Sequence, residues 1–187
     1  TVFDLASLTK PLVTVALVLD LVSQGRLELN AAVGDLLPPF ADGTDVRRSR
    51  VTVRDLLRHD SGLPAYRKYF EGFEATRPPS AVEAQQRRAR MLGLAAAEPL
   101  ERDPRSGSVY SDVGFLVLGA LVEGVAGRRI DELFAERIAG PLGVDEVWSA
   151  DLARRATPDW ADRAAATGDC AWRGHAVHAA VQDENAW

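Results

Sequence analysis

A nearly continuous apolar run, residues 12–22, is the feature that most limits how this chain can fold. A helix that is apolar on every side has no polar face to offer to water, so it is normally buried. Pro11 places the start of this helix, because proline is tolerated in the first turn and is costly further along. We therefore predict a buried helix that begins near Ser7 and stops at Gly25, a residue suited to the position just after a helix.

Ser7 and Lys10 lie three residues apart at the start of this helix. Side chains at that spacing meet only where the backbone is helical, and here a hydroxyl would meet an amine. We expect Lys10 to be partly desolvated at the edge of the core, which would lower its pKa and let it take a proton from the hydroxyl. A serine at a helix start can also be a simple N-cap. The pair indicates a serine nucleophile, with capping as the alternative.

A second element, Tyr110-Ser111-Asp112, precedes another apolar stretch at residues 113–122. Either Ser111 or Asp112 can cap a helix that starts there, which leaves Tyr110 on the turn before it. Taken alone, these residues describe a helix cap beside a partly buried tyrosine. Their meaning changes when they are combined with Ser7 and Lys10.

Together the two elements resemble the serine β-lactamase and penicillin-binding-protein superfamily, whose first motif is Ser-x-x-Lys. The closer resemblance is to its class C-like branch, which includes D-Ala-D-Ala carboxypeptidases and family VIII esterases and has Tyr-x-Asn as its second motif. Three further stretches resemble family segments in the same order: residues 51–64, 140–144 and 183–187. The resemblance implies an α/β (α+β) fold of the β-lactamase/transpeptidase type along most of the chain.

The sequence departs from the family pattern in two places. Asp112 stands where the family most often has asparagine, and a carboxylate only accepts hydrogen bonds whereas an amide also donates them. Asp112 could pair with Lys10 and hold it charged, or it could cap the helix and point away. The third family motif, Lys-Thr-Gly or His-x-Gly, does not occur before Trp187. The resemblance therefore implies that residues 1–187 form a partial domain, without the N-terminal strands and the third-motif region.

The remaining pattern is mostly helical. Ser80 and Glu83 form a capping-box pattern for a helix that runs to about residue 97. Further helices are expected at residues 112–127 and 130–139. Alternation with a period of two is scarce, and the chain from Asp159 onward is expected to be irregular. These elements correspond to the helical part of the family fold, with much of its antiparallel sheet missing.

The resemblance implies acyl transfer through a covalent serine ester. Ser7 would attack a carbonyl carbon, and either Lys10 or Tyr110 would accept its proton. Lysine and tyrosine side chains both ordinarily keep their protons at neutral pH, so the sequence leaves the base open. The oxyanion would be held by the Ser7 amide and by an amide outside this chain. We therefore expect residues 1–187 alone to be a poor catalyst, and no cofactor is implied.

The expected partner is a small-molecule or peptide substrate: a β-lactam, a D-Ala-D-Ala peptide or an ester. The competing hypothesis is a non-catalytic homologue with a binding or assembly role. Composition supports one core-forming domain, since 187 residues with 47% hydrophobic side chains can bury a sizeable core. A net charge of -5 argues against nucleic acid or an anionic membrane as partner. The run at residues 12–22 contains Asp20 and is too short to span a membrane.

Other chemistries find little support. Cys170, His175, His178 and Asp183 lie close in sequence, but their spacing matches no common zinc arrangement, so no metal is predicted. No Gly-x-Ser-x-Gly nucleophile elbow is present. His59 lies near a serine without a third triad member, so a loop or capping role is expected for it. Compartment and oligomeric state are not indicated.

Overall fold

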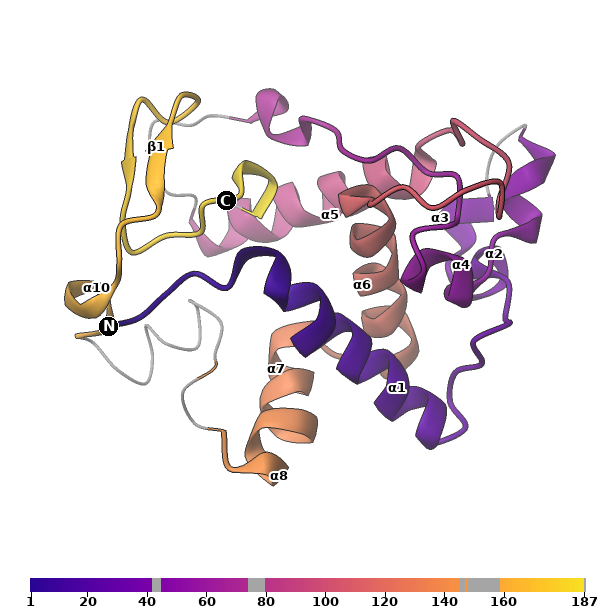
Figure 1. Ribbon diagram of the computed structural model, residues 1–187, viewed down its shortest axis with the longest axis horizontal. Helices are drawn as coiled ribbons and strands as arrows, with labels where there is room; N and C mark the ends of the chain where they lie inside the picture. The colour runs from indigo at the N-terminus through magenta and orange to yellow at the C-terminus, as the bar shows by residue number, and fades with distance from the viewer. Residues whose placement is uncertain (42–44, 74–79, 145–146, 148–158, 187) are drawn as a thin grey trace.

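Helix α6, Asp112–Ala126, lies at the centre of the fold, and the other helices are arranged around it (Figure 1). The computed structural model describes residues 1–41, 45–73, 80–144, 147 and 159–186. Helix α6 is central because its sequence is apolar on most sides. It contributes some of the most deeply buried side chains of the core: Val113, Val117, Leu118, Leu121 and Val122. The helix ends at Gly127 in the left-handed conformation, within one residue of the predicted end.

The predicted N-terminal helix is present as three successive segments. A short turn, η1 (Ala6–Leu8), leads into the wide turns of η2 (Lys10–Val15) and then into helix α1 (Ala16–Ser23). Its end is confirmed, because Gln24 caps the helix and Gly25 follows with φ of 67°. Leu17, Val18 and Leu21 pack into the core, whereas Leu12 and Leu19 are 45% and 52% exposed. The helix is therefore buried on one face only, which corrects the expectation of burial all round.

The segment Ala6–Ser23 is long and apolar enough to cross a membrane by length and composition, with a mean hydropathy of 1.5. No other helix in the described ranges meets that test. This is weak support for a membrane role, because a core helix passes the same test. The three segments η1, η2 and α1 together form the N-terminal rod, which packs against α6 and α7 (Ile130–Phe134). Asp20, near the C-terminal end of the rod, forms an ion pair with Arg137 at 3.1 Å. Three side chains of the rod belong to the buried core: Leu17, Val18 and Leu21.

Helix α5 (Ala81–Ala97) begins as predicted. Ser80 accepts a hydrogen bond from the Glu83 amide, and the Glu83 carboxylate accepts one from the Ser80 amide, which completes the capping box. The predicted helix at residues 130–139 is also present, as α7 followed by η5 (Ala135–Ala139). The remaining helical segments are short: α2 (Val33–Leu36), α3 (Pro38–Ala41), η3 (Val46–Arg50), α4 (Val53–Leu57), η4 (Tyr69–Gly72), α8 (Gly140–Leu142), α10 (Trp160–Arg163) and η6 (Glu184–Ala186).

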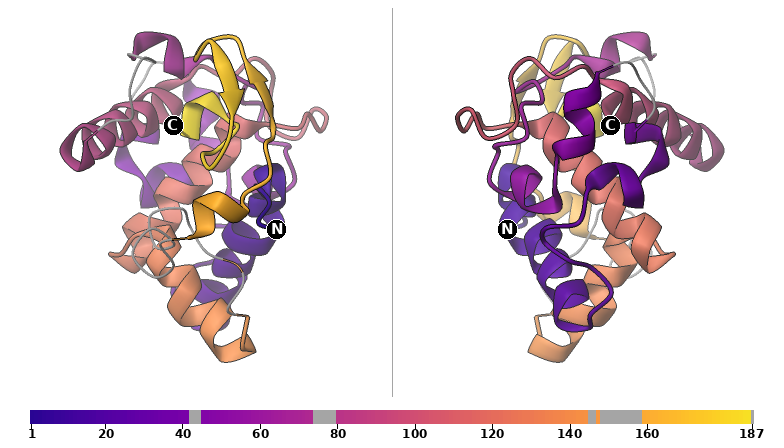
Figure 2. Two further views of the ribbon diagram at one scale, coloured as in Figure 1. Left: turned by 90° about the vertical axis from the view of Figure 1, so that its left-hand side faces the viewer. Right: turned by 90° about the vertical axis from the view of Figure 1, so that its right-hand side faces the viewer.

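The chain after residue 159 is more ordered than the sequence indicated. Helix α10 is followed by an antiparallel hairpin of β1 (Gly168–Cys170) and β2 (His175–Val177), with Asp169 opposite Ala176. Its strands have three residues each, which is too short for alternation to be recognised in the sequence. The hairpin and α8 lie at opposite ends of the molecule (Figure 2). The described residues thus form a mainly helical domain with one small sheet.

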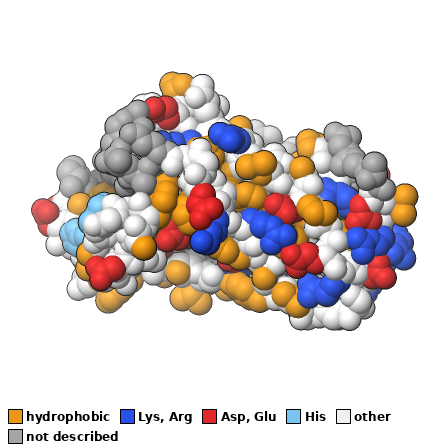
Figure 3. Space-filling model, turned by 90° about the horizontal axis from the view of Figure 1, so that it is seen from above, with side chains coloured by type: hydrophobic (Ala, Val, Ile, Leu, Met, Phe, Trp, Pro, Cys, Tyr) orange, Lys and Arg blue, Asp and Glu red, His pale blue; other side chains and the backbone are white. Residues whose placement is uncertain are grey.

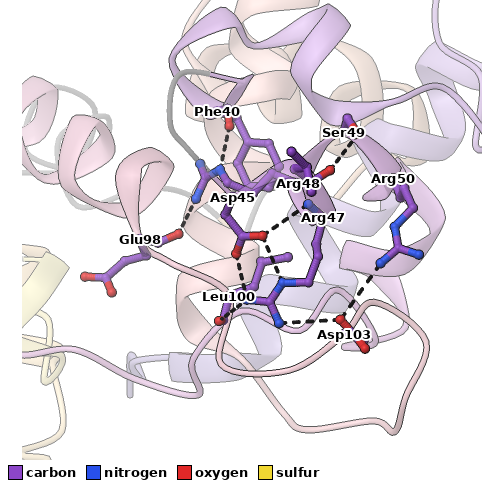
Figure 4. Close-up of polar contacts among 10 residues, drawn as sticks. Phe40, Asp45, Arg47, Arg48, Ser49, Arg50, Glu98, Leu100 and Asp103 are labelled. Carbon is purple, nitrogen blue, oxygen red and sulfur yellow. Dashed lines mark hydrogen bonds and ion pairs between the residues drawn. The ribbon is translucent and has the colours of Figure 1, made fainter.

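Arg48, in η3, is a buried cation that joins three parts of the fold. It is 3% exposed, and its guanidinium donates to the carbonyl of Phe40 at 2.8 Å and to that of Glu98 (Figure 4). It also donates to the carbonyl of Ala96. The last two carbonyls belong to the C-terminal end of α5, where helix carbonyls lack partners within the helix. The guanidinium also lies 4.2 Å from the centre of the Phe40 ring. Arg48 therefore caps α5 from a distant segment.

Charged side chains of both signs occur together on the surface. On the face shown in Figure 3, Lys and Arg side chains lie beside Asp and Glu side chains. Arg87, Arg88 and Arg90 form a basic run on α5, and each of them has a partner within the chain. Arg88 pairs with Glu123, and the other two arginines lie over the Phe73 ring. That run is therefore largely engaged within the chain.

Candidate active site

Ser7, Lys10 and Asp112 form a contiguous polar chain. The Lys10 ammonium donates a hydrogen bond to Ser7 Oγ at 3.0 Å, and its Nζ lies 2.6 Å from Asp112 Oδ1. The first contact follows from local backbone geometry, because both residues lie on adjacent helical turns. The second joins the N-terminal rod to the first turn of α6. The lysine and aspartate side chains are 16% and 33% exposed, so this ion pair is partly shielded from water.

The charge of Lys10 is set by two opposing effects. Burial lowers the pKa of Lys10, but the nearby Asp112 carboxylate and Tyr110 hydroxyl raise it by more, so that it lies above its usual value. The expectation of a lowered pKa is therefore wrong. Desolvation alone would have lowered it, and the nearby carboxylate reverses the sign. Lys10 is a cation at neutral pH.

The second motif divides its roles between neighbouring residues. Ser111 is the N-cap of α6, and its Oγ accepts from the Gly114 amide at 2.9 Å while donating to the Pro64 carbonyl at 2.6 Å. Because Ser111 fills the capping role, the Asp112 carboxylate is left to face Lys10. The alternative that Asp112 caps the helix and points away is thereby excluded.

A pocket of about 600 Å³ lies beside the Ser7–Lys10 contact. Ser7, Lys10 and Tyr110 all line it, and most of its other lining side chains are apolar: Leu5, Ala6, Leu8, Pro11, Val15, Leu57 and Phe115. His59 lines it as well, although the sequence suggested only a loop or capping role for this residue. No linear motif singles out His59, because it reaches the pocket only when two distant loops pair.

Those two loops, residues 58–65 and 101–112, are joined by a series of backbone hydrogen bonds. The Glu101 amide donates to the Gly62 carbonyl, the Arg105 amide to the Asp60 carbonyl and the Asp112 amide to the Ala65 carbonyl. Gly62 is required by this close approach, since its φ is 85° and a Cβ there would lie 2.3 Å from the Arg102 carbonyl oxygen. The paired loops carry Tyr110 to the pocket.

The four residues singled out in the sequence thus meet at one site. The side chains of Cys170, His175 and His178, which lie close in sequence, each contact a different group. The His175 ring contacts the Ala176 carbonyl, the His178 ring contacts the Ala164 carbonyl, and Cys170 Sγ lies 3.5 Å from Glu184. Within the described part of the chain, no group of three His, Cys, Asp or Glu residues is placed to hold a metal ion.

A serine and a lysine one helical turn apart, as Ser7 and Lys10 are, form the Ser-x-x-Lys motif of serine hydrolases of the β-lactamase and penicillin-binding-protein type. A family model described as "Beta-lactamase" matches residues 1–182, and the chain belongs to this family. This confirms the family expected from the two motifs and, with it, the fold class.

Three known proteins illustrate the relationship. The Escherichia coli (strain K12) protein named "Putative D-alanyl-D-alanine carboxypeptidase" is 35% identical over 150 residues, which cover 77% of this chain and 33% of that protein. A penicillin-binding-protein homologue from Caulobacter crescentus superposes with a TM-score of 0.58 at 27% identity, over 75% of this chain and 34% of that one. EstCE1, titled a hydrolase with promiscuous acyltransferase activity, superposes with a TM-score of 0.56 at 33% identity, over 75% and 38% of the two chains. The chain spans about a third of the length of such relatives.

Proposed function

We propose that this chain carries the nucleophile of a serine hydrolase that forms a covalent acyl-enzyme with an ester, amide or β-lactam carbonyl. The observation that carries the proposal is the 3.0 Å contact between Ser7 Oγ and Lys10 Nζ at the edge of the 600 Å³ pocket. A serine hydroxyl is a weak nucleophile unless a neighbouring group activates it, and Lys10 and Tyr110 provide such neighbours.

Ser7 is the serine best placed to act. It is exposed and lines the pocket, whereas Ser61 and Ser111 are only 2% and 1% exposed. Those two hydroxyls have structural tasks, because Ser61 Oγ accepts from the Leu63 amide and Ser111 caps α6. Acylation of either would break a buried hydrogen bond, which favours Ser7 as the nucleophile.

Tyr110 is the better candidate for the base. An ammonium group has no lone pair to accept a proton, and the Asp112 carboxylate keeps Lys10 in that form. In the proposed step Tyr110 acts as its phenolate: Ser7 Oγ forms a bond to the carbonyl carbon, the serine proton passes to the phenolate oxygen, and the carbonyl π electrons move to the carbonyl oxygen. The tetrahedral adduct then collapses to the Ser7 ester, and the departing alcohol or amine takes that proton from Tyr110. Lys10 then serves as a cationic donor that stabilises negative charge on Ser7 Oγ as the proton leaves. Water later releases the acyl group.

The lining of the pocket favours a substrate with an apolar group next to the reacting carbonyl. Leu5, Leu57 and Phe115 contribute walls there, and Lys10 and His59 are its basic side chains. The names of the relatives, a carboxypeptidase and a hydrolase with acyltransferase activity, agree with carbonyl chemistry of this kind. Because the chain spans about a third of such proteins, we propose that residues outside it complete the substrate site.

A fluorophosphonate probe tests the assignment of the nucleophile. In the full-length protein we expect one covalent adduct, located on Ser7 by peptide mass spectrometry. Ser7→Ala should abolish the adduct without lowering the melting temperature, since Ser7 is exposed. Ser49→Ala, at an exposed serine that does not line the pocket, is the matched control and should leave the labelling rate unchanged. An adduct on Ser61 or Ser111, or a folded protein that does not react at all, would contradict the proposal and support a non-catalytic role.

A further inference from the structure

Burial alone does not hold the Tyr110 side chain in one position, so other contacts have to do so. Its side chain is 52% exposed, and it lies in the loop just before α6 rather than inside a helix. A half-exposed side chain on a loop normally samples several rotamers, whereas a proton-transfer group has to stay within hydrogen-bond reach of its partner. The residues that contact Tyr110 and its two neighbours therefore decide how well it can act.

One residue, His59, contacts the chain on both sides of Tyr110. The Val109 amide donates to the His59 carbonyl at 2.8 Å, and the Ser111 amide donates to His59 Nδ1 at 2.9 Å. The residue before Tyr110 and the residue after it are thus tied to the same histidine. These two bonds fix the backbone from which the tyrosine side chain projects.

The His59 ring also contacts the tyrosine ring directly. Its centre lies 4.6 Å from the centre of the Tyr110 ring and 4.9 Å from that of Phe115. The Lys10 ammonium lies 4.9 Å from the Tyr110 ring centre and 5.8 Å from that of Phe115. The tyrosine is therefore held by ring contact with His59 and by a nearby cation.

We propose that His59 is the positioning residue for Tyr110, acting through the hydrogen bond that its Nδ1 accepts from the Ser111 amide. This inference rests on the proposed function, because it assumes that the Tyr110 hydroxyl takes part in proton transfer. His59 itself transfers no proton in this scheme. Its role requires the neutral ring with the proton on Nε2, since a protonated Nδ1 cannot accept from an amide.

The charged surroundings favour the neutral ring. Burial and the positive charge of Lys10 lower the pKa of His59, and the carboxylate of Asp112 opposes them. The neighbours of His59 in the chain, Arg58 and Asp60, pair with each other at 3.6 Å. Tyr110 faces the ring from the loop before α6. Because the pKa of His59 is lowered, its Nδ1 can accept the hydrogen bond from the Ser111 amide at neutral pH. Protonation of the ring, which would break this bond, is confined to acidic pH.

The backbone at His59 suggests the variants that test this role. His59 has a φ of 58°, a region that asparagine tolerates better than most residues. His59→Asn keeps an acceptor oxygen close to the position of Nδ1 but removes the ring. His59→Phe keeps a ring but removes the acceptor. The pair therefore separates the hydrogen bond from the ring contact.

The rate of Ser7 acylation by a p-nitrophenyl ester is the readout in the full-length protein. We expect His59→Phe to lower it roughly 10- to 100-fold, less than the ~10²–10⁴-fold effect of losing a proton-transfer group itself. His59→Asn should restore most of that loss. If His59→Asn is the slower of the two variants, the hydrogen bond to Nδ1 does not position Tyr110 and the proposal is overturned.

A double-mutant cycle with Tyr110→Phe distinguishes positioning from a general structural effect. If His59 acts through the tyrosine hydroxyl, His59→Phe should slow the wild type yet have less than about a twofold effect in the Tyr110→Phe background. A merely structural role would lower the rate equally in both backgrounds. Equal effects would therefore refute the inference.

Two further measurements keep the test decisive. Nitrogen NMR of the imidazole in the unmodified protein should show Nδ1 without a proton at neutral pH, and a protonated Nδ1 would overturn the proposal even if a variant fails to fold. The fluorophosphonate adduct on Ser7 reports separately on the proposed function. A wild type that never labels Ser7 contradicts that function, whereas normal labelling with additive His59 and Tyr110 effects contradicts only the positioning role.

Discussion

Replacing the buried Arg48 with methionine should destabilise the whole domain. The guanidinium donates to three carbonyl oxygens, those of Phe40, Ala96 and Glu98, and the side chain is 3% exposed. Methionine fills much of the same volume but donates no hydrogen bond. The variant therefore leaves three carbonyls without their partner and removes a cation from the C-terminal end of α5, where the helix dipole favours positive charge.

The expected cost follows from the number of partners lost. Each buried acceptor left unsatisfied costs about 1–3 kcal/mol, so three cost about 3–9 kcal/mol together. A typical domain is stable by only ~5–15 kcal/mol, so Arg48→Met should consume a large part of the margin. Arg50→Met is the matched control, because Arg50 lies two residues away, is 57% exposed and forms a 3.9 Å ion pair with Asp103 (Figure 4). A surface pair of that kind contributes at most about 1 kcal/mol.

Urea unfolding of the full-length protein, followed by circular dichroism, measures both variants. With a denaturant dependence of about 1–3 kcal/mol per molar urea, a loss of 3 kcal/mol lowers the midpoint by roughly 1 M or more. Arg50→Met should shift it only slightly. Equal midpoints for Arg48→Met and Arg50→Met would refute the argument that the three carbonyls depend on this guanidinium.

Two further predictions concern the site. Asp112→Asn removes the carboxylate that raises the pKa of Lys10, so Lys10 should lose its proton at lower pH than in the wild type. In the wild type the ion pair stabilises the fold below the ordinary lysine pKa of 10.5. This contribution is lost as the pH rises through the folded-state pKa of Lys10. In the pH–rate profile the alkaline limb should move to lower pH if Lys10 acts as a cation, whereas movement of the acid limb with higher activity at neutral pH would identify Lys10 as the base. Tyr110→Phe keeps the ring contact with His59 and should fold normally while losing roughly 10²–10⁴-fold in turnover of a p-nitrophenyl ester. Wild-type turnover in that variant would assign Tyr110 a structural role.

Features that depend on neighbouring residues could be predicted from the amino-acid sequence. The meeting of Ser7 and Lys10, the capping box of Ser80 and Glu83, and the helix end at Gly127 were all predicted and are all present. Each depends on backbone geometry within one helical turn, which residue type and spacing largely specify. The family followed from the order of such local motifs along the chain, and the match over residues 1–182 confirms it.

Which distant groups meet, and what charge they carry, depends on how the helices and loops pack together. Asp112 had two possible roles in the sequence, and the packing of α6 against the N-terminal rod turned its carboxylate toward Lys10. That contact reversed the expected pKa shift of Lys10, because the direction of the shift depends on the balance between burial and a nearby charge. The placement of His59 beside Tyr110 and of Arg48 at the end of α5 likewise depends on how separate loops pair. Such contacts follow from three-dimensional packing, and no spacing along the chain encodes them.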